Sequence, residues 1–547
     1  MEKWFCGGGA VTKSAIDRSI MTTSPSTISI GAGDWLRLNA RRFPERVCFD
    51  DRGTGRTFTF AETNNRVNRL ANALMERGIK KGDRIAILAI DSCEYMETLL
   101  ASMKLGTIYV PLNYRLNPDE VRNLVSTAGV RWIFVSSAYV EIAASLTGPE
   151  GQKLNMVVYD DPDTSAWSYN NFISAANDDE PSVTVFEEDI LGLAFTSGTT
   201  GLPKGVLQSQ RMLKRGTFAM MIDYEMGADE RRYSAAPMFH ISGMALIMLG
   251  VMSGFPSILY PQFDPDRLLD WMHAGDLTGC FLVPTMVSTL VEHPKASNGS
   301  YDGLRTILYG AAPMSPTLLR KAMALFGCDF IQAFGAGTEA MAQAILSSAD
   351  HRRAVAGAEH LLGSIGKAST GVELRICDAE LNDVPRGEVG EIVTRSETVM
   401  SGYLDNPVAT AESLPDGWFR AGDLAYMDEE GYLYLSGRRN DMIIRGGENI
   451  YPIEIETVLQ AHTGVVQAAV VGIADDHWGE VVVACLMFRE GFDTPSDEQL
   501  LAHCRAHLAS YKVPITFVVL DEFPLNASGK ILKRELIEHL SRLEAFR

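Results

Sequence analysis

Short apolar segments alternate with helix-like patterns along the first part of the chain. Residues 84–90, 108–112, 132–135 and 156–159 are each apolar enough to form a buried strand. Before the first of them, Val67, Leu70, Ala71 and Leu74 recur at positions i, i+3, i+4 and i+7, which is the apolar face of a helix. Such alternation predicts an α/β fold with mainly parallel sheets covered by helices.

The character of the sequence changes near residue 435. A charged, glycine-rich stretch over residues 437–449 precedes a smaller unit with its own expected strands (465–471, 481–488) and helices (453–461, 497–508). We therefore predict three parts: a flexible lead over residues 1–29, a large domain over 30–437, and a small, mobile α+β domain over 438–547.

Charge and apolar runs exclude some classes of partner. Lys and Arg number 49 against 69 Asp and Glu, a formal charge of −20, which argues against nucleic acid or an anionic membrane as the main partner. The apolar run 244–252 is shorter than the ~20 residues of a membrane span, so we expect a buried helix there. The eight cysteines are scattered, which fits neither a zinc site nor a disulfide framework. No secretory signal is evident, so we expect a cytoplasmic protein.

The strongest local signal is the segment LAFTSGTTGLPKGV over residues 193–206. An expected strand runs into a loop rich in glycines and hydroxyls, which let backbone N–H groups and side chains approach phosphate oxygens. The alternative is a flexible surface loop. A Walker A loop is excluded because Lys204 is followed by Gly205. The candidate phosphate-binding residues are Thr196, Ser197, Gly198, Thr199, Thr200, Gly201 and Lys204.

This loop resembles the signature of the AMP-forming adenylating superfamily, which includes acyl-CoA synthetases, luciferases and peptide-synthetase adenylation domains. Further segments follow in the order of that family: PLNYRL (111–116), PMFH (237–240), YGAAP (309–313), GTE (337–339), GSIG (363–366), GWFRAGD (417–423), GR (437–438), RGGENIYP (445–452) and NASGK (526–530). They span nearly the whole chain.

The resemblance implies that a carboxylate attacks the α-phosphate of ATP and releases pyrophosphate. Two anions meet in this step, so cations and Mg²⁺ are needed to offset the charge. By resemblance, Lys530 is the catalytic lysine that bridges both reactants, and Glu339 with Thr196 holds the metal. Thr338 is then a neighbouring phosphate contact. The alternative for Lys530 is a solvated tail lysine.

The nucleoside of ATP has its own implied contacts. Asp423 corresponds to a carboxylate that accepts hydrogen bonds from the ribose hydroxyls, and Arg438 to a second ribose or phosphate contact. The adenine ring is expected against residues Gly310, Ala311, Ala312, Phe334 and Gly335. One departure concerns Phe334: the segment FGAGTE (334–339) carries one residue more than the family's aromatic-Gly-x-Thr-Glu pattern.

Coenzyme A is the implied acceptor. His240 would lie between the acyl pocket and the thiol channel, with a core histidine as the alternative. Gly446 and Gly447 would line the pantetheine tunnel, although both also suit a β-turn. Trp478 would pack on the CoA adenine or serve as a half-buried structural residue. Asn440 occupies the position of the family's hinge.

Together these features predict an ATP-dependent acid–thiol ligase that forms an acyl-adenylate and then acyl-CoA and AMP. No acidic residue lies between Glu230 and Asp264, which disfavours an amino acid. The Met- and Leu-rich segment after His240 favours a fatty or other apolar acid, with an aryl or arylpropenoic acid as the alternative. A separate carrier protein is a further alternative acceptor. The sequence leaves the oligomeric state open, a homo-oligomer included.

Overall fold

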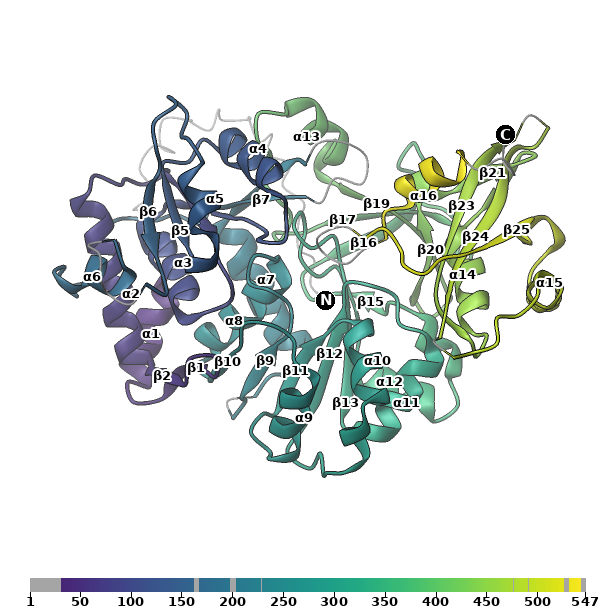
Figure 1. Cartoon of the computed structure of the whole chain (residues 1–547), viewed down its shortest axis with the longest axis horizontal. Coiled ribbons are helices and arrows are strands. Elements are labelled where there is room, and N and C mark those ends of the chain that lie inside the picture. Colours follow the sequence, from purple (N-terminus) through teal and green to yellow (C-terminus); the bar gives the residue numbers. More distant parts are fainter. Residues whose placement is uncertain are drawn as a thin grey trace, which may run out of the picture.

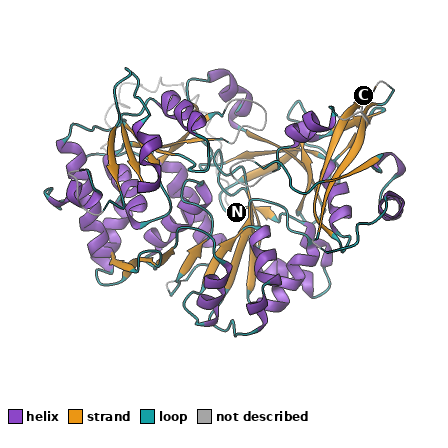
Figure 2. Cartoon of the chain, viewed as in Figure 1, coloured by secondary structure: helices purple, strands orange, loops and turns teal. Residues whose placement is uncertain are grey.

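The computed structural model describes residues 31–161, 167–196, 203–227, 229–475, 477–489, 491–525 and 531–542. A large α/β part holds most of the chain, and a smaller part with its own sheet holds the C-terminal residues (Figures 1 and 2). The predicted flexible lead, residues 1–29, lies outside the described residues. The predicted domain boundaries remain a prediction.

A seven-stranded sheet organises the first part of the chain. Its order is β18 (Gly402–Tyr403), β8 (Gly205–Ser209), β7 (Ile190–Phe195), β4 (Ile108–Pro111), β3 (Arg84–Leu88), β5 (Trp132–Val135) and β6 (Asn155–Val158). The strands from β7 to β6 are parallel, whereas β8 and β18 are antiparallel to their neighbours. The four strands expected from apolar runs all belong to the parallel portion.

A nine-stranded sheet forms the second layer. Its order is β15 (Lys367–Ala368), β14 (Ala344–Leu346), β13 (Asp329–Phe334), β12 (Thr306–Gly310), β11 (Gly279–Leu282), β9 (Arg232–Ser234), β10 (Ser257–Leu259), β1 (Val47–Asp51) and β2 (Arg56–Thr59). Strands β13 to β1 run parallel, and short antiparallel strands close both edges. Mainly parallel sheets are therefore confirmed.

Helices fill the space between the two sheets and cover their outer faces. The largest apolar core joins both sheets through α1 (Asp34–Arg42), α2 (Phe60–Glu76), α3 (Cys93–Leu105), α6 (Tyr169–Ser174), α7 (Gln210–Asp223) and α8 (Ile241–Ser253). The outer face of the seven-stranded sheet packs on α4 (Pro118–Ala128) and α5 (Val140–Ala144). The far face of the nine-stranded sheet packs on α9 (Pro265–His273), α10 (Pro284–Glu292), α11 (Pro316–Phe326) and α12 (Ser348–Val355). Helix α13 (Pro407–Ser413) contacts β18.

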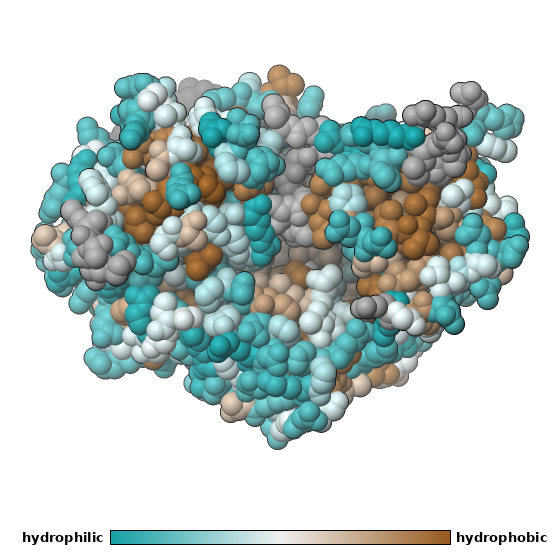
Figure 3. Space-filling model, in the orientation of Figure 1, coloured by the Kyte–Doolittle hydropathy of each residue, from teal (hydrophilic) through white to brown (hydrophobic). Residues whose placement is uncertain are grey.

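Two further, mainly antiparallel sheets follow in the described part of the chain. One sheet contains β16 (Glu373–Cys377), β17 (Gly390–Arg395), β19 (Phe419–Met427) and β20 (Leu433–Arg438). The C-terminal sheet contains β22 (Glu448–Ile450), β21 (Ile443–Arg445), β24 (Gly479–Phe488) and β23 (Val465–Asp475), with β25 (Thr516–Val519) parallel to β24. Its helices are α14 (Pro452–Gln460), α15 (Asp497–His507) and α16 (Lys533–Leu540). Figure 3 shows a largely hydrophilic face on which apolar residues gather in two areas, one at the upper left over the first sheet and one over this C-terminal part.

Local sequence explains where the helices begin and end. In α2 the side chain of Thr59 accepts a hydrogen bond from the N–H of Glu62 while Glu62 caps Thr59 in return, and the predicted apolar positions Val67, Leu70, Ala71 and Leu74 are buried. Helix α8 covers the apolar run 244–252 and ends at Gly254, whose φ of 83° suits glycine. No described helix is long and apolar enough to cross a bilayer.

Candidate active site

The predicted phosphate loop connects β7 to β8. Where the strands end, the N–H of Thr196 donates to the carbonyl of Lys204 (3.0 Å), and the N–H of Lys204 donates to Oγ1 of Thr196 (3.2 Å). These two bonds fix both ends of the loop. Ser197, Gly198, Thr199, Thr200 and Gly201 lie outside the described residues, and so does Lys530.

Glu339 lies beside this loop, in contact with a residue that the sequence did not single out. The hydroxyl of Tyr403 donates to Oε1 of Glu339 (3.5 Å), and Nζ of Lys204 lies 4.9 Å from the centre of the Tyr403 ring. Burial raises the pKa of Glu339 to about 7, although the Tyr403 hydroxyl and the charges of Arg438 and Lys204 oppose the shift. Two predicted site residues, Glu339 and Lys204, thus flank one tyrosine.

Pairing between distant strands places Tyr403 there. In β18, Gly402 and Tyr403 pair with Leu207 and Val206 of β8, so Tyr403 lies next to the strand that Lys204 precedes. From the same strand, Nε2 of Gln208 donates to the backbone carbonyl of Thr338 (2.9 Å), which ties the Glu339 loop to β8. Neither Tyr403 nor Gln208 has a local sequence signal for this role, because each depends on contacts between segments far apart in the chain.

The two predicted ribose contacts lie side by side. Asp423 of β19 pairs in register with Arg438 of β20, and Nε of Arg438 is 3.3 Å from Oδ1 of Asp423. Arg438 lies close enough to Glu339 for its charge to lower the pKa of that carboxyl group. The structure therefore gathers Thr196, Lys204, Glu339, Asp423 and Arg438 in one region, drawn from four separate segments.

The predicted adenine-binding residues follow the carboxyl ends of β12 and β13. A Cβ on Gly310 would lie 2.4 Å from the carbonyl oxygen of Ala333, so only glycine allows these strands to approach. Ala311 and Ala312 come next, with Ala311 at a φ of 68°. The ends of parallel strands are the usual place for ligands in open α/β sheets.

The extra residue in the 334–339 segment is absorbed by a tight loop between β13 and β14. The N–H of Gln343 donates to the carbonyl of Phe334 (2.7 Å), and the N–H of Met341 donates to Gly337 (3.0 Å). A Cβ on Gly335 would meet the carbonyl of Met341 at 1.8 Å. Phe334 is half-buried and packs on a small apolar cluster. Its stacking on adenine stays a prediction.

The residues predicted to handle CoA lie on three separate segments. His240 is the N-cap of α8, half-buried, with its ring 5.3 Å from that of Phe239. Gly446 and Gly447, at φ 60° and 89°, form the two-residue turn between β21 and β22, so the turn interpretation is confirmed. Trp478 is 45% exposed, and its carbonyl accepts the N–H of Gly446 (2.7 Å). Asn440 is exposed in a 3-10 turn, Arg439–Asp441, between the last two sheets.

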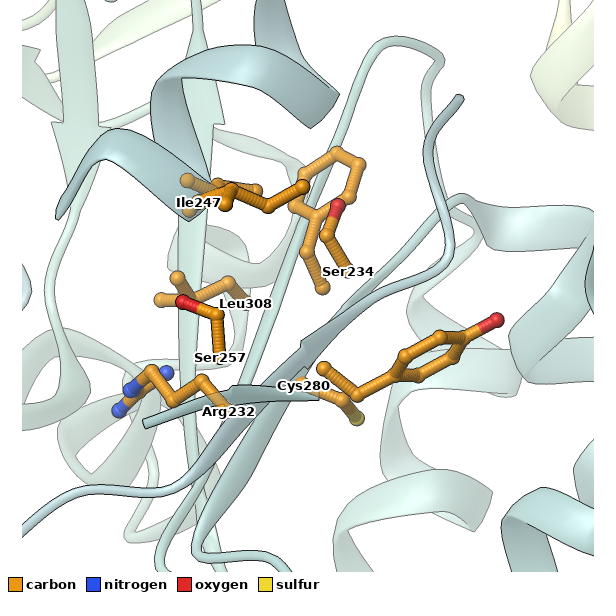
Figure 4. A pocket seen from close by; sticks show the side chains of 9 residues that line it. Arg232, Ser234, Ile247, Ser257, Cys280 and Leu308 are labelled. Atoms are coloured by element: carbon orange, nitrogen blue, oxygen red, sulfur yellow. The ribbon is translucent and has the colours of Figure 1, made fainter. Parts of the chain in front are cut away.

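A small cavity lies under α8, against the nine-stranded sheet. Its volume is about 10 Å³, and its lining includes Leu246 and Ile247 from α8 and Phe281 and Leu308 from the sheet. Figure 4 shows Ile247 above Leu308, with Arg232 below them. This volume accommodates about one water molecule.

Comparison with known proteins decides the family. The family model described as AMP-binding enzyme matches residues 36–404, and the model for the AMP-binding enzyme C-terminal domain matches residues 454–530. The chain belongs to the AMP-binding enzyme family. The predicted adenylate-forming superfamily and the predicted fold are thereby confirmed.

Relatives of this AMP-binding enzyme cover almost its full length. A feruloyl-CoA synthase of an Amycolatopsis species is 36% identical over 507 residues, 92% of this chain and 98% of the relative. A fatty acid–[acyl-carrier-protein] ligase of Streptomyces coeruleorubidus is 33% identical over 88% of this chain and 91% of its own. The o-succinylbenzoate CoA synthetase of Bacillus subtilis, solved with its acyl-adenylate intermediate, has a TM-score of 0.80 at 30% identity, with 92% and 97% of the chains covered.

Proposed function

We propose that this chain, an AMP-forming acid–CoA ligase, activates an aryl carboxylic acid with ATP and transfers the aryl acyl group to CoA. The observation that carries the choice of acid is the similarity to a feruloyl-CoA synthase, which is 36% identical over 92% of this chain. The o-succinylbenzoate CoA synthetase among the solved relatives supports the same class.

The first half-reaction joins the acid to the α-phosphate. The carboxylate oxygen attacks phosphorus, and pyrophosphate leaves. Lys204 lies beside Tyr403 and Glu339 and supplies positive charge where phosphate oxygens gather. Asp423 forms an ion pair with Arg438 in the structure. When ATP binds, its carboxylate would instead accept hydrogen bonds from the two ribose hydroxyls. Lys530 would bridge carboxylate and α-phosphate, because two negatively charged groups must approach each other in the transition state.

Mg²⁺ fits the residues at the Glu339 site. Glu339 offers carboxylate oxygens with a pKa raised to about 7 by burial, so a cation there would restore its charge. Among the described residues no group of three His, Cys, Asp or Glu gathers around one point. One carboxylate beside phosphate oxygens is a usual way to hold Mg²⁺. Glu339, with Thr196, would hold the ion, which would offset phosphate charge.

The second half-reaction transfers the acyl group. The thiol of CoA attacks the carbonyl carbon of the adenylate, and AMP leaves. We assign His240 to the junction of acid and thiol, Gly446 and Gly447 to the pantetheine arm, and Trp478 to the CoA base. The ring of Trp478 is exposed and lies 5.4 Å from the guanidinium of Arg445, which suits a base with nearby phosphates. Asn440 would be the pivot between the two half-reactions.

A panel of acids tests the function. Ferulate, benzoate, indole-3-acetate, octanoate and palmitate are each incubated with ATP and Mg²⁺, with and without CoA, and AMP, pyrophosphate and thioester are measured. We expect pyrophosphate release with the aryl acids and thioester only when CoA is added. A higher kcat/KM for palmitate than for every aryl acid contradicts the proposed acid.

A fatty acid or a carrier-protein acceptor is the second candidate. The apolar α8 and the fatty acid–[acyl-carrier-protein] ligase relative favour it. In the same panel, thioester formation on an added holo-carrier protein, with none on CoA, identifies the carrier-protein acceptor. A higher kcat/KM for palmitate than for every aryl acid identifies the fatty acid.

A further inference from the structure

Asp91 is a buried acidic residue that contacts the segment carrying His240. It follows β3 in the seven-stranded sheet and is 8% exposed. Its Oδ1 accepts a hydrogen bond from the backbone N–H of Met238 (2.9 Å), two residues before His240. The bond therefore links one sheet to the turn that begins α8 on the other.

Aromatic residues hold the same turn from a second direction. The ring of Phe239 packs edge-on against Tyr114 (5.2 Å between centroids), and Tyr114 stacks on Tyr139 (5.7 Å). The guanidinium of Arg115 lies 5.5 Å from the Tyr114 ring and 5.8 Å from the Phe239 ring. The backbone of Met238 and the ring of Phe239 are thus both fixed by segments of the first sheet.

The charge on Asp91 is costly in this position. Burial raises its pKa to about 7, opposed by the Met238 N–H and by the charge of Arg115. The other titratable groups near it are Tyr95, Tyr114 and Tyr233, whose own pKa values are raised chiefly by burial. An amide would accept the same N–H without the cost of burying a charge. A carboxylate makes the stronger acceptor, which points to a role for the strength of this bond.

We propose that Asp91 is a positioning residue that holds the Met238 N–H and thereby places His240 for acyl transfer to the thiol. The proposal rests on the function proposed above. It assigns to Asp91 no contact with substrate. We expect the loss of Asp91 to slow the thioester step, because the proposed place of His240 is at the junction with the thiol. Adenylate formation should be affected less, because the predicted phosphate contacts lie on other segments.

The test separates the two half-reactions. Pyrophosphate release in a single turnover reports adenylate formation, and mixing preformed aryl-adenylate with CoA reports thioester formation. Asp91→Ala is expected to slow the thioester step roughly tenfold or more, since a lost hydrogen bond also lets the residue shift. Adenylate formation should change less than about twofold. Asp91→Asn, which keeps a weaker, neutral acceptor, should give a thioester rate between those of wild type and Asp91→Ala at pH 8.

Two controls isolate the route through His240. In a His240→Ala background, Asp91→Ala should have no further effect on the thioester step. Asp51→Ala is the matched control: Asp51 is 1% exposed and accepts the N–H of Thr54 (3.0 Å) in the turn between β1 and β2. It should lower Tm without changing the ratio of the two half-reactions.

The pH profile gives a readout that a purely structural role would not move. Protonation weakens Asp91 as an acceptor, so the wild-type thioester rate should fall as the pH drops through about 7. In Asp91→Asn the fall should be shallower, because only the CoA thiol then titrates in this range. This comparison also decides the matter if Asp91→Ala does not fold. An equally steep fall in Asp91→Asn, equal losses in both half-reactions, or additive effects with His240→Ala would overturn the inference. A wild-type enzyme that makes no thioester from any acid overturns the proposed function instead.

Discussion

Glu339 holds a carboxyl group in a place that water reaches poorly. Its neighbours, Tyr403, Lys204 and Arg438, offset only part of the cost of its charge. A group of this kind suits a site that gains a cation with its substrate, because the positive charge of the cation would stabilise the ionised carboxylate. The same feature links the stability of the free protein to pH.

Glu339→Gln should raise the Tm of the free enzyme at pH 8 while abolishing adenylate formation. Burial lifts the pKa of Glu339 from 4.5 to about 7, so its ionisation destabilises the folded state above that range. The gain in Tm should shrink as the pH falls from 7 towards 4.5. Thermal unfolding across this range measures it. Glu388→Gln, at an exposed turn position, should change neither quantity.

Lys530→Ala should abolish adenylate formation yet spare CoA attack on a supplied adenylate. The first step brings two anions together and needs the cation, whereas the second does not. Losing such a charge at the transition state costs on the order of 10²-fold or more. Lys530→Arg keeps the charge and serves as the control. Equal losses in both half-reactions would contradict the assignment.

At the scale of elements, two adjacent glycines determine the conformation of the turn in the β21–β22 hairpin. Both Gly446 and Gly447 have positive φ, and a Cβ on Gly446 would meet Trp478 at 2.9 Å. Around Gly447 a Cβ would meet nothing within 4 Å, so that side of the turn is open. Substitutions at Gly447 can therefore separate two effects. One is the backbone strain of any side chain at a positive φ, and the other is obstruction of the predicted pantetheine tunnel by a large side chain.

Gly447→Leu should leave adenylate formation near normal and block thioester formation, whereas Gly447→Ala should largely retain both. The two variants share the strain of a side chain at φ 89° but differ in bulk. Rapid-quench assays of adenylate and thioester compare them. If Leu and Ala lose thioester formation equally, the residue acts through the turn alone.

Elements with local patterns were predictable from the sequence, and contacts between distant segments were not. The apolar period of α2, the apolar run of α8 and the long strands β23 and β24 all lie where the sequence indicates. Tyr403 was not predicted, because its place depends on a two-residue strand pairing with β8 about two hundred residues earlier. The loop 335–341 likewise depends on Gly335 meeting the Met341 carbonyl. The motif residues Lys204, Glu339, Asp423 and Arg438 do gather, but their roles stay predictions.

At the scale of the whole molecule, the chain passes from the four-stranded sheet to the C-terminal sheet through the turn at Arg439–Asp441. Arg438, on one side, pairs with Asp423, the predicted ribose contact, and Arg439 pairs with Glu391 at 3.2 Å. Beyond the turn, Arg445 leads into the Gly446–Gly447 hairpin. A rotation at Asn440 would therefore move the hairpin while leaving the Asp423 region in place.

Asn440→Pro should still release pyrophosphate in a single turnover but accumulate adenylate when CoA is present. Proline holds φ near −65°, which suits a 3-10 turn but resists the rotation. Separate measurement of adenylate and thioester by rapid quench tests this. Asn440→Ala, which leaves φ free, should behave like wild type. A wild-type thioester rate in the proline variant would place the pivot elsewhere.

The pairing of β18 with β8 also has a consequence for synthesis. Until residue 403 leaves the ribosome, β8 is an open sheet edge, and the flank that Tyr403 gives to Lys204 does not exist. In the nine-stranded sheet, β1 pairs with β10, which is synthesised some two hundred residues later. Nascent chains of this enzyme are therefore long and incompletely paired before any nucleotide site forms, a period in which chaperones have most to protect.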